Sequence, residues 1–403
     1  MNKLESSQSF SLTASITTVS QVTQKKKELL LIGGGHSQLF VLEAFAHDPE
    51  AKVNITLVSP QRHTPYSGAL SACLAGFIPQ NKLFIDLSAL AKKANATFIQ
   101  AELSSVDTEE QLIHLSNHSS LAYDYLSLNT GSLPQAGLIT GAEENTVGVK
   151  PIENFLQRWN VIQAQCGESL TTPIKIGFIG AGVAGCELAI TITNTLKNTL
   201  LEQKGDPDLI QVHLFADNPE PCPALPESFR KKVLKAFNDS GVYFHPEEAV
   251  TEIQKQILVT NNSQYKFDEI FLTTTAQAPA WAKESGIETD INGFIVVNES
   301  LQSTSHPNIF ATGDIATMKN SPRPKSGVFA VRQGKPLAYN LRMVLQNKPL
   351  QSYKPQSKAL VLMSTGRKNV LATRGNWSAQ GRVWWWLKNA LDENFLKRFN
   401  QNP

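Results

Sequence analysis

Two glycine-rich turns restrict the fold of this 403-residue chain more than any other feature. Each turn follows a short apolar run and precedes apolar residues at helical spacing, in the stretches "ELLLIGGGHSQLFVLEAFA" (28–46) and "IKIGFIGAGVAGCELA" (174–189). Each stretch is followed by a second strand-like run, at 53–59 and at 210–217. Strand, helix and strand in this order form a βαβ unit with parallel strands. The sequence therefore predicts an α/β protein built around two such units.

The second turn carries the complete spacing G-x-G-x-x-G, as Gly180, Gly182 and Gly185. In a Rossmann-like unit the first glycine permits the tight turn, the second lets the backbone approach a pyrophosphate, and the third lets helix and strand pack closely. The pyrophosphate charge is then favoured at the helix N-terminus. Asp217 closes the partner strand and is a candidate for holding ribose hydroxyls, although the long helix places it beyond the usual ~20 residues. We therefore predict a dinucleotide site at this turn.

The first turn departs from that spacing at two points. Gly33 and Gly35 are present, but Gln38 occupies the third position, where we expect it to loosen the packing of helix on strand without removing the anion site. Ser59 ends the partner strand, where an acidic residue usually holds the ribose. We expect His36 to order the loop. Taken alone, this turn fits a purely structural connection as well as a dinucleotide site.

Charge and hydropathy exclude several other classes of protein. The formal net charge is +2, and beyond Lys25–Lys27 no basic residues cluster, which argues against a nucleic-acid surface. No run of about 18 apolar residues occurs, so we expect no membrane-spanning helix. The histidines lack metal-ligand spacing, so no metal site is expected. The first 27 residues are rich in Ser, Thr and Gln and lack a signal-peptide core, which predicts a disordered tail at 1–27.

The four cysteines, Cys73, Cys166, Cys186 and Cys222, lie far apart in the sequence and form no CxxC or CxxxxC pair. This pattern argues against a redox dithiol of close spacing and favours a reducing, cytoplasmic location. Ordinary packing is the expected role of all four thiols.

Two further stretches resemble motifs of the FAD-dependent pyridine nucleotide-disulfide oxidoreductase superfamily. "HPNIFATGDIATM" (306–318) resembles its second flavin-contacting motif, and "YDYLSLNTGS" (123–132) resembles its strand followed by Thr-Gly. The resemblance implies that Asp314 holds the ribityl chain of FAD. It also implies that the first glycine turn binds FAD and the second binds NAD(P)H.

The lack of a cysteine pair narrows the resemblance to type II NADH dehydrogenases. The chain resembles most the dehydrogenase-like flavoprotein that occurs alone or fused ahead of selenide, water dikinase, through the stretches 62–70, 323–341 and 381–399. No kinase domain follows, so we expect the stand-alone form. The implied function is transfer of electrons from NADH through FAD to a quinone or similar small acceptor. A reductase linked to selenium metabolism and a flavin-binding sensor without turnover remain alternatives.

The resemblance also predicts the domains and the site residues. The FAD domain is expected at 28–149 and 281–345, with the NAD(P) domain inserted at 150–280 and a C-terminal segment at 346–403. The residues expected to bind FAD are Gly33, Gly35, His36, Ser37, Ser59, Arg62, Pro65, Tyr66, Thr130, Gly131, Gly313, Asp314, Gly327 and Val328. Those expected to bind NADH or NADPH are Gly180, Gly182, Gly185 and Asp217.

Two residues are candidates for a part in the chemistry. Glu187 follows the second glycine turn, on the helix face that meets the flavin in related enzymes, where it is expected to assist proton movement. Its alternative role is a carboxylate favoured only by the helix dipole. Lys325 precedes a helix whose first amides, at 326–328, are expected to point at negative charge on the flavin. Its alternative role is a solvated loop lysine.

The acceptor is less well defined. Type II dehydrogenases carry Ala-Gln and Gln-Gln where this chain has Gly327-Val328 and Arg332-Gln333, so only Gln333 agrees and a quinone site is an open question. The predicted helix at 382–399 places Trp384, Leu387, Leu391, Phe395 and Phe399 on one apolar stripe, with Lys388 among the basic residues on the remaining surface. Such a helix can lie in a membrane interface, which would make the protein peripheral on the cytoplasmic face. It can equally dock on the protein body or on a second subunit.

Overall fold

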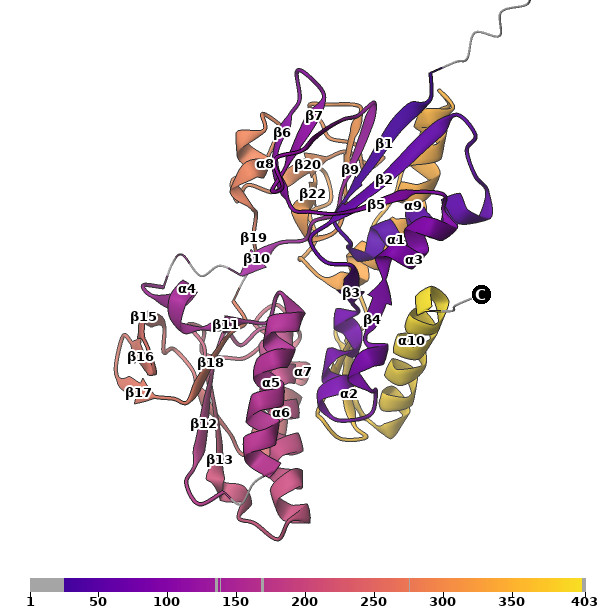
Figure 1. The fold of residues 1–403 in the computed structure, drawn as a ribbon. Coiled ribbons are helices and arrows are strands. Elements are labelled where there is room, and N and C mark those ends of the chain that lie inside the picture. The colour runs from indigo at the N-terminus through magenta and orange to yellow at the C-terminus, as the bar shows by residue number, and fades with distance from the viewer. Residues whose placement is uncertain (1–24, 135–136, 138, 168–169, 275, 401–403) are drawn as a thin grey trace, which may run out of the picture.

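The computed structural model describes residues 25–134, 137, 139–167, 170–274 and 276–400. The tail predicted at 1–27 lies almost wholly outside these ranges, and the first strand begins at Lys27. Figure 1 shows two α/β bodies joined by a narrow connection, with a C-terminal segment lying beside both. The mixed α/β class with two parallel sheets agrees with the prediction.

The first body contains a five-stranded parallel sheet in the order β21-β9-β1-β2-β5. Its strands are β1 (Lys27–Ile32), β2 (Val53–Ser59), β5 (Thr97–Gln100), β9 (Tyr125–Leu128) and β21 (Ile309–Ala311). Three helices cover it, namely α1 (His36–His47), α3 (Leu87–Lys93) and α9 (Gly327–Leu345). Strand β1 is fully buried from Leu29 to Ile32, as expected for a strand covered on both faces.

The second body repeats this plan in the order β11-β18-β12-β13-β14, again wholly parallel. Its strands are β11 (Val147–Gly148), β12 (Ile174–Ile179), β13 (Ile210–Phe215), β14 (Val242–His245) and β18 (Glu269–Leu272). Helices α5 (Ile152–Gly167), α6 (Val183–Glu202) and α7 (Glu227–Ser240) lie on one side of the sheet in Figure 1. On the other side lies a small antiparallel sheet of β15 (Val250–Gln254), β16 (Ile257–Thr260) and β17 (Gln264–Lys266).

Short elements complete and connect the bodies. The antiparallel pair β10 (Leu133–Pro134) and β19 (Ala276–Gln277) forms the connection between them. The others in the first body are β3 (His63–Pro65), α2 (Leu70–Leu74), β4 (Phe84–Asp86), β6 (Leu103–Asp107), β7 (Leu112–Leu115), β8 (Ser120–Ala122), α8 (Ala280–Glu284), β20 (Ile295–Val297) and β22 (Ala316–Met318). Helix α4 (Ala142–Asn145) precedes β11. The domain boundaries inferred from the sequence stay a prediction, and β11 joins the second sheet just upstream of residue 150.

The C-terminal segment contacts both bodies. Its antiparallel sheet of β23 (Val361–Ser364), β24 (Val370–Arg374) and β25 (Trp377–Gly381) rests on the second body, where Asn194 Nδ2 donates to the Thr365 carbonyl at 2.7 Å. Helix α10 (Arg382–Asn400) turns back to the first body, where Arg398 pairs with Glu43 at 2.5 Å. The segment therefore ties the two bodies together.

Helix α10 differs from the stripe expected from its sequence. Phe395 and Phe399 are buried, but Leu387 and Leu391 are exposed, so the predicted apolar stripe is divided between two faces. Lys388, expected on the surface, is buried instead. The prediction for Lys388 was wrong because the helix docks through an inner face that contains charged as well as aromatic side chains. None of the helices within the described ranges is long and apolar enough to cross a membrane.

Candidate functional site

Three long helices that the sequence patterns had singled out begin at N-cap residues whose own side chains provide no cap. Helices α1, α6 and α9 have Gly35, Gly182 and Ser326 as N-caps, none with a side-chain cap, and none carries an acidic residue in its first turn. The first amides of a helix lack intrahelical acceptors, and the helix dipole favours negative charge there. Each terminus is therefore suited to bind an anionic group.

The first glycine turn is held closed by Asn129, a residue that the sequence analysis did not single out. Its Oδ1 accepts from the Ser37 amide at 3.2 Å, and its Nδ2 donates to the Thr312 carbonyl at 2.6 Å. Gly33 adopts φ +91°, and an added Cβ at Gly35 would lie 2.1 Å from Asn129 Oδ1. One buried amide thus joins three of the segments predicted to hold FAD. Its position directly before Thr-Gly was the available signal.

Gln38 does not loosen this turn as expected. Its side chain is fully buried, and Nε2 donates to the carbonyl and hydroxyl oxygens of Ser127 on β9 at 2.9 and 3.0 Å. The longer side chain therefore binds α1 to the sheet through hydrogen bonds, where a glycine would permit close packing. Ser59 lies buried at the end of β2 beside Gly34. Arg62 pairs with Asp86 at 2.8 Å at the surface of the same body.

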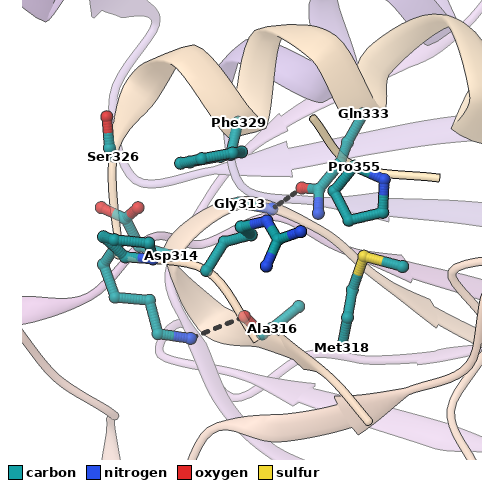
Figure 2. A pocket seen from close by; sticks show the side chains of 11 residues that line it. Gly313, Asp314, Ala316, Met318, Ser326, Phe329, Gln333 and Pro355 are labelled. Carbon is teal, nitrogen blue, oxygen red and sulfur yellow. Dashed lines mark hydrogen bonds between the residues drawn. The ribbon is translucent and has the colours of Figure 1, made fainter. Parts of the chain in front are cut away.

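Asp314 lies at the centre of the predicted flavin-binding residues. Its Oδ2 is 2.7 Å from Lys150 Nζ, contributed by the start of the second body, and 3.5 Å from Ser132 Oγ. The preceding Gly313 has φ +70° and donates its amide to Gln333 Oε1 at 2.7 Å, a contact drawn in Figure 2. Gln333, the residue shared with type II dehydrogenases, is thus engaged in holding the turn that carries Asp314.

A small cavity beside Asp314 is bounded by the start of α9. Figure 2 shows Ser326, Phe329 and Gln333 of this helix above Gly313 and Asp314. Lys325 lies at the cavity edge, but its Nζ donates to the Ala316 carbonyl at 2.6 Å. Burial lowers the pKa of Lys325 to about 8. This lysine is half-buried and hydrogen-bonded rather than freely solvated, and a role in the chemistry stays a prediction.

Tyr66 links the first glycine turn to the C-terminal helix. Its ring stacks on Phe395 with centroids 4.2 Å apart, and its edge-on contact with His36 has a centroid distance of 5.5 Å. Burial, with a smaller effect from Lys150, lowers the pKa of His36 to about 4, so this imidazole is neutral at pH 7. Pro65 ends the short strand β3 just before Tyr66. The predicted flavin wall is therefore also the surface on which α10 docks.

The second glycine turn depends on residues that have no side chain. Gly180 adopts φ +107°, and an added Cβ at Gly185 would lie 2.0 Å from the Gly180 carbonyl oxygen. An added Cβ at Gly182 meets nothing within 4 Å, so the space in front of the α6 N-terminus is open. Asp217 is exposed beyond β13, where its Oδ1 accepts from Asn218 Nδ2 at 2.6 Å. These residues leave room for a pyrophosphate and a ribose.

Glu187 lies where the two bodies and the C-terminal segment meet. Its Oε1 accepts from Ser71 Oγ of α2 at 2.9 Å and from the Ser364 amide of β23 at 2.7 Å. Burial raises the pKa of this carboxyl group, while Lys388 and the two hydrogen bonds oppose the rise. Glu187 is therefore held by hydrogen bonds from two other segments and by the charge of Lys388, which a carboxylate favoured only by its helix dipole would not require.

Lys388 and Asp392 of α10 form a buried ion pair next to Glu187. Lys388 Nζ is 2.9 Å from Asp392 Oδ2 and donates to the Gly68 carbonyl at 2.5 Å. Only 9% and 6% of the two side chains are exposed. Sequence reasoning missed both because charged residues on a surface helix are normally solvated.

The remaining predicted contacts lie near these groups. Gly131 has φ +82° with open space at its Cβ position, and Thr130 beside it is exposed. Gly327 opens α9 close to Ser67, and Val328 follows it in the first turn. The buried Thr312 hydroxyl next to Gly313 has no hydrogen-bond partner among the residues that the structure describes. Helix N-termini that begin at N-caps without a capping side chain, glycine turns free of side chains and this unpaired hydroxyl fit the binding of an FAD molecule by these segments.

The comparisons with known proteins agree with this geometry. The family model described as pyridine nucleotide-disulphide oxidoreductase matches residues 27–334. The NADH dehydrogenase-like protein YutJ of Bacillus subtilis (strain 168) is 23% identical over 368 residues, covering 91% of this chain and 97% of that protein. The type II NADH:quinone oxidoreductase of Haemophilus influenzae is also 23% identical, covering 83% and 84%.

Solved structures share the fold over nearly the whole chain. The sulfide:quinone oxidoreductase of Aquifex aeolicus superposes with a TM-score of 0.76 at 18% identity, covering 93% of this chain and 91% of that one. NDH2 from Plasmodium falciparum in complex with NADH gives a TM-score of 0.76 at 15% identity, covering 94% and 99%. The predicted fold class, family and use of FAD and NAD(P)H are confirmed. The chain belongs to the pyridine nucleotide-disulphide oxidoreductase family and is an FAD-dependent NAD(P)H oxidoreductase.

Proposed function

We propose that this enzyme oxidises NADH and passes the electrons through FAD to a quinone or a similar small acceptor at a membrane surface. The observation that carries the proposal is the position of Glu187, held between the NAD(P)-binding helix α6, the FAD-side helix α2 and the C-terminal strand β23. A proton-carrying group at this junction suits a reaction in which a nicotinamide, a flavin and an acceptor are brought together. Two relatives of this chain support the proposal, because one is named an NADH dehydrogenase-like protein and the other a type II NADH:quinone oxidoreductase.

The residues of the second turn support NADH as the donor. The open N-terminus of α6 would hold the pyrophosphate, and Asp217 would accept hydrogen bonds from ribose hydroxyls. A carboxylate at this position repels a 2′-phosphate, which disfavours NADPH. Asp217 is therefore proposed as the residue that selects NADH.

The first body would bind FAD, which when bound supplies the chemistry of accepting hydride from the nicotinamide. The first turn of α9 would stabilise negative charge on the flavin ring through its free amides. Tyr66 would exclude water on the side covered by α10. Lys325 would contribute positive charge near the same helix start through its position rather than by proton transfer, because its ammonium donates to Ala316.

The outer face of α10 supports peripheral contact with the cytoplasmic face of a membrane. Val383, Trp386 and Leu391 are 74%, 66% and 50% exposed, and Leu387 lies beside them at the same helical spacing. Trp377 on the adjoining hairpin is also exposed and contacts Trp384 edge-on at 5.0 Å between centroids. Exposed tryptophans beside leucines are typical of helices that rest in the headgroup region. Such a position would bring a lipophilic acceptor close to Glu187.

The activity is tested by anaerobic mixing of FAD-loaded enzyme with NADH, followed by a panel of acceptors. NADH should bleach the flavin absorbance, and a water-soluble quinone analogue should restore it faster than dioxygen or a selenium compound does. Fast reoxidation by a selenium compound alone would favour the link to selenium metabolism, which stays a prediction. A flavin that NADH fails to bleach would favour the sensor and contradict the proposal.

The membrane contact is tested by co-sedimentation with anionic liposomes. Replacing Trp386, Leu387 and Leu391 by serine should release the protein from the vesicles, because each apolar side chain contributes on the order of 1.5–3 kcal/mol of burial. Serine at Leu201 and Ile291, which are exposed and far from α10 in sequence, is the matched control and should leave sedimentation unchanged. Equal binding by both variants would contradict the membrane proposal without bearing on flavin reduction.

A further inference from the structure

The inner face of α10 contains charges that its docking does not require. The same helix already rests on Tyr66 through Phe395 and is fixed by the ion pair of Arg398 with Glu43. Burying Lys388 and Asp392 removes two charges from water, a cost that their mutual attraction seldom repays in full. An apolar pair of the same size would serve docking at least as well. The burial of Lys388 and Asp392 therefore indicates a role beyond stability.

Asp392 holds the Lys388 ammonium away from full pairing with Glu187. The ammonium donates to Asp392 and to the Gly68 carbonyl, whereas its interaction with Glu187 is Coulombic only. Asp392 also accepts from the Tyr66 hydroxyl. Glu187 is left with two neutral donors, the Ser71 hydroxyl and the Ser364 amide.

The cluster contains two carboxyl groups for a single cation. Burial raises the pKa of both Glu187 and Asp392. Burial alone would lower the pKa of Lys388, but the two carboxylates raise it above its ordinary value, so this residue stays charged.

Three titratable groups on the segments that contact the cluster or Phe395 beside it are neutral at pH 7. Burial lowers the pKa of His36 to about 4 and raises that of Cys73 to about 11. Burial likewise raises the pKa of Tyr66 above its ordinary value. Electroneutrality of this buried site is therefore reached when one of the two carboxyl groups keeps a proton.

We propose that Asp392 is a positioning residue of the enzyme: by binding Lys388 itself, it leaves the Glu187 carboxyl group to store the proton that the acceptor consumes. This inference rests on the proposed function. Oxidation of NADH by a quinone follows NADH + H⁺ + quinone → NAD⁺ + quinol, in which hydride carries two electrons and one proton. The second proton of the quinol comes from water. The pair of Glu187 and Asp392, neutralised by Lys388, is a buried store for that proton.

The sign of the pH effect follows from this arrangement. Replacing Asp392 by asparagine removes the like charge beside Glu187 and frees Lys388 to pair with it. Both changes favour the ionised form of Glu187, so its pKa falls. Reoxidation by quinone requires protonated Glu187 and is lost as pH rises through that pKa. In Asp392→Asn this loss should therefore occur at least about one pH unit lower than in the wild type.

The experiment measures reoxidation of NADH-reduced holoenzyme by a water-soluble quinone across pH. The matched control is Glu393→Gln, because Glu393 pairs with Lys397 at 2.9 Å with the same i, i+4 spacing on the same helix but in solvent. Its profile should coincide with that of the wild type. Asp392→Glu, which keeps the charge, should restore the wild-type profile. If Asp392→Asn fails to retain FAD, two other variants decide the proposal. Asp392→Glu should keep the loss of reoxidation at rising pH, and Glu187→Gln should abolish that pH dependence.

A second readout does not depend on turnover. Infrared difference spectra of the oxidised protein should contain the carbonyl band of a protonated carboxyl group at pH 7, absent in both Glu187→Gln and Asp392→Asn. Persistence of that band in Asp392→Asn, or an unshifted pH profile, would overturn the proposal. If quinones fail to reoxidise the flavin at any pH, the proposed function fails instead, and the infrared band still decides where the proton is stored.

Discussion

The two glycine turns of this molecule have the same backbone plan and different surroundings. In the first, the Gly33 amide donates to Val58 and the Asn129 amide to Ile32, at 2.8 Å each. In the second, the Gly180 amide donates to Phe215 and the Thr273 amide to Ile179, at 2.9 Å each. Asn129 and Thr273 thus occupy equivalent places, each following the strand beside the turn.

Their side chains make the two turns different. Asn129 reaches across the first turn to the Ser37 amide and fills the space that a Cβ at Gly35 would need. Within the described residues the shorter Thr273 hydroxyl bonds to carbonyls of its own turn, at Ile179 and Gly180, and the space at Gly182 stays open. A turn locked by a buried amide suits a cofactor that remains bound, and an open turn suits one that exchanges at each turnover.

The largest effect should come from filling the open turn. Gly182→Val places its Cβ where no atom of the described residues lies within 4 Å, and the backbone angles of Gly182, φ −69° and ψ 178°, suit any residue. We expect the protein to fold and retain FAD, while NADH affinity falls about 100-fold, roughly 2.7 kcal/mol. Flavin absorbance during an anaerobic NADH titration measures this loss.

The corresponding change in the first turn is the matched comparison. Gly35→Val would bring Cβ within 2.1 Å of Asn129 Oδ1, so this variant should lose FAD or fail to fold. If Gly182→Val released FAD and kept NADH reduction, the assignment of the two turns would be reversed.

A smaller effect is expected from unlocking the first turn. Asn129→Ala removes the acceptor of the Ser37 amide and the donor to the Thr312 carbonyl. Leaving these buried groups unpaired costs about 1–3 kcal/mol each, so FAD affinity should fall at least tenfold. Fluorescence titration of the apoprotein with FAD measures it. Thr273→Val, which removes the matching hydroxyl, should leave FAD affinity unchanged. Equal FAD affinity in wild type and Asn129→Ala would show that the amide does not lock the turn.

The sequence predicted the turns well because their geometry is local. A glycine with positive φ, such as Gly33 or Gly180, is required by the turn itself and is visible as a residue type at a fixed spacing. The parallel strands followed from short apolar runs in the same way. What remained hidden were contacts between segments far apart in the chain, such as Asn129 with Ser37.

The C-terminal helix shows the same limit more clearly. The spacing of its apolar residues predicted a helix correctly. That spacing alone does not say which face of the helix packs on the body, because both faces carry apolar residues. Burial of Lys388 depends on Glu187 and Gly68, more than 190 residues away. Helical spacing on α10 contains no information about those partners, so the charged inner face could not be predicted.

The smallest effects are expected at the third positions of the two turns, Gln38 in the first and Gly185 in the second. Gln38→Ala removes two hydrogen bonds to Ser127, but it also removes the Gln38 Oε1 atom, which is buried with no partner in the described part of the chain. These effects oppose each other, so we expect a loss of about 1 kcal/mol in the free energy of unfolding and little change in FAD affinity. Gly185→Ala should cost more, because its Cβ would lie 2.0 Å from the Gly180 carbonyl oxygen, which no rotamer can relieve. Thermal unfolding of both variants measures the difference, and a larger loss in Gln38→Ala would mean that the amide, rather than backbone contact, is the stronger link between helix and sheet.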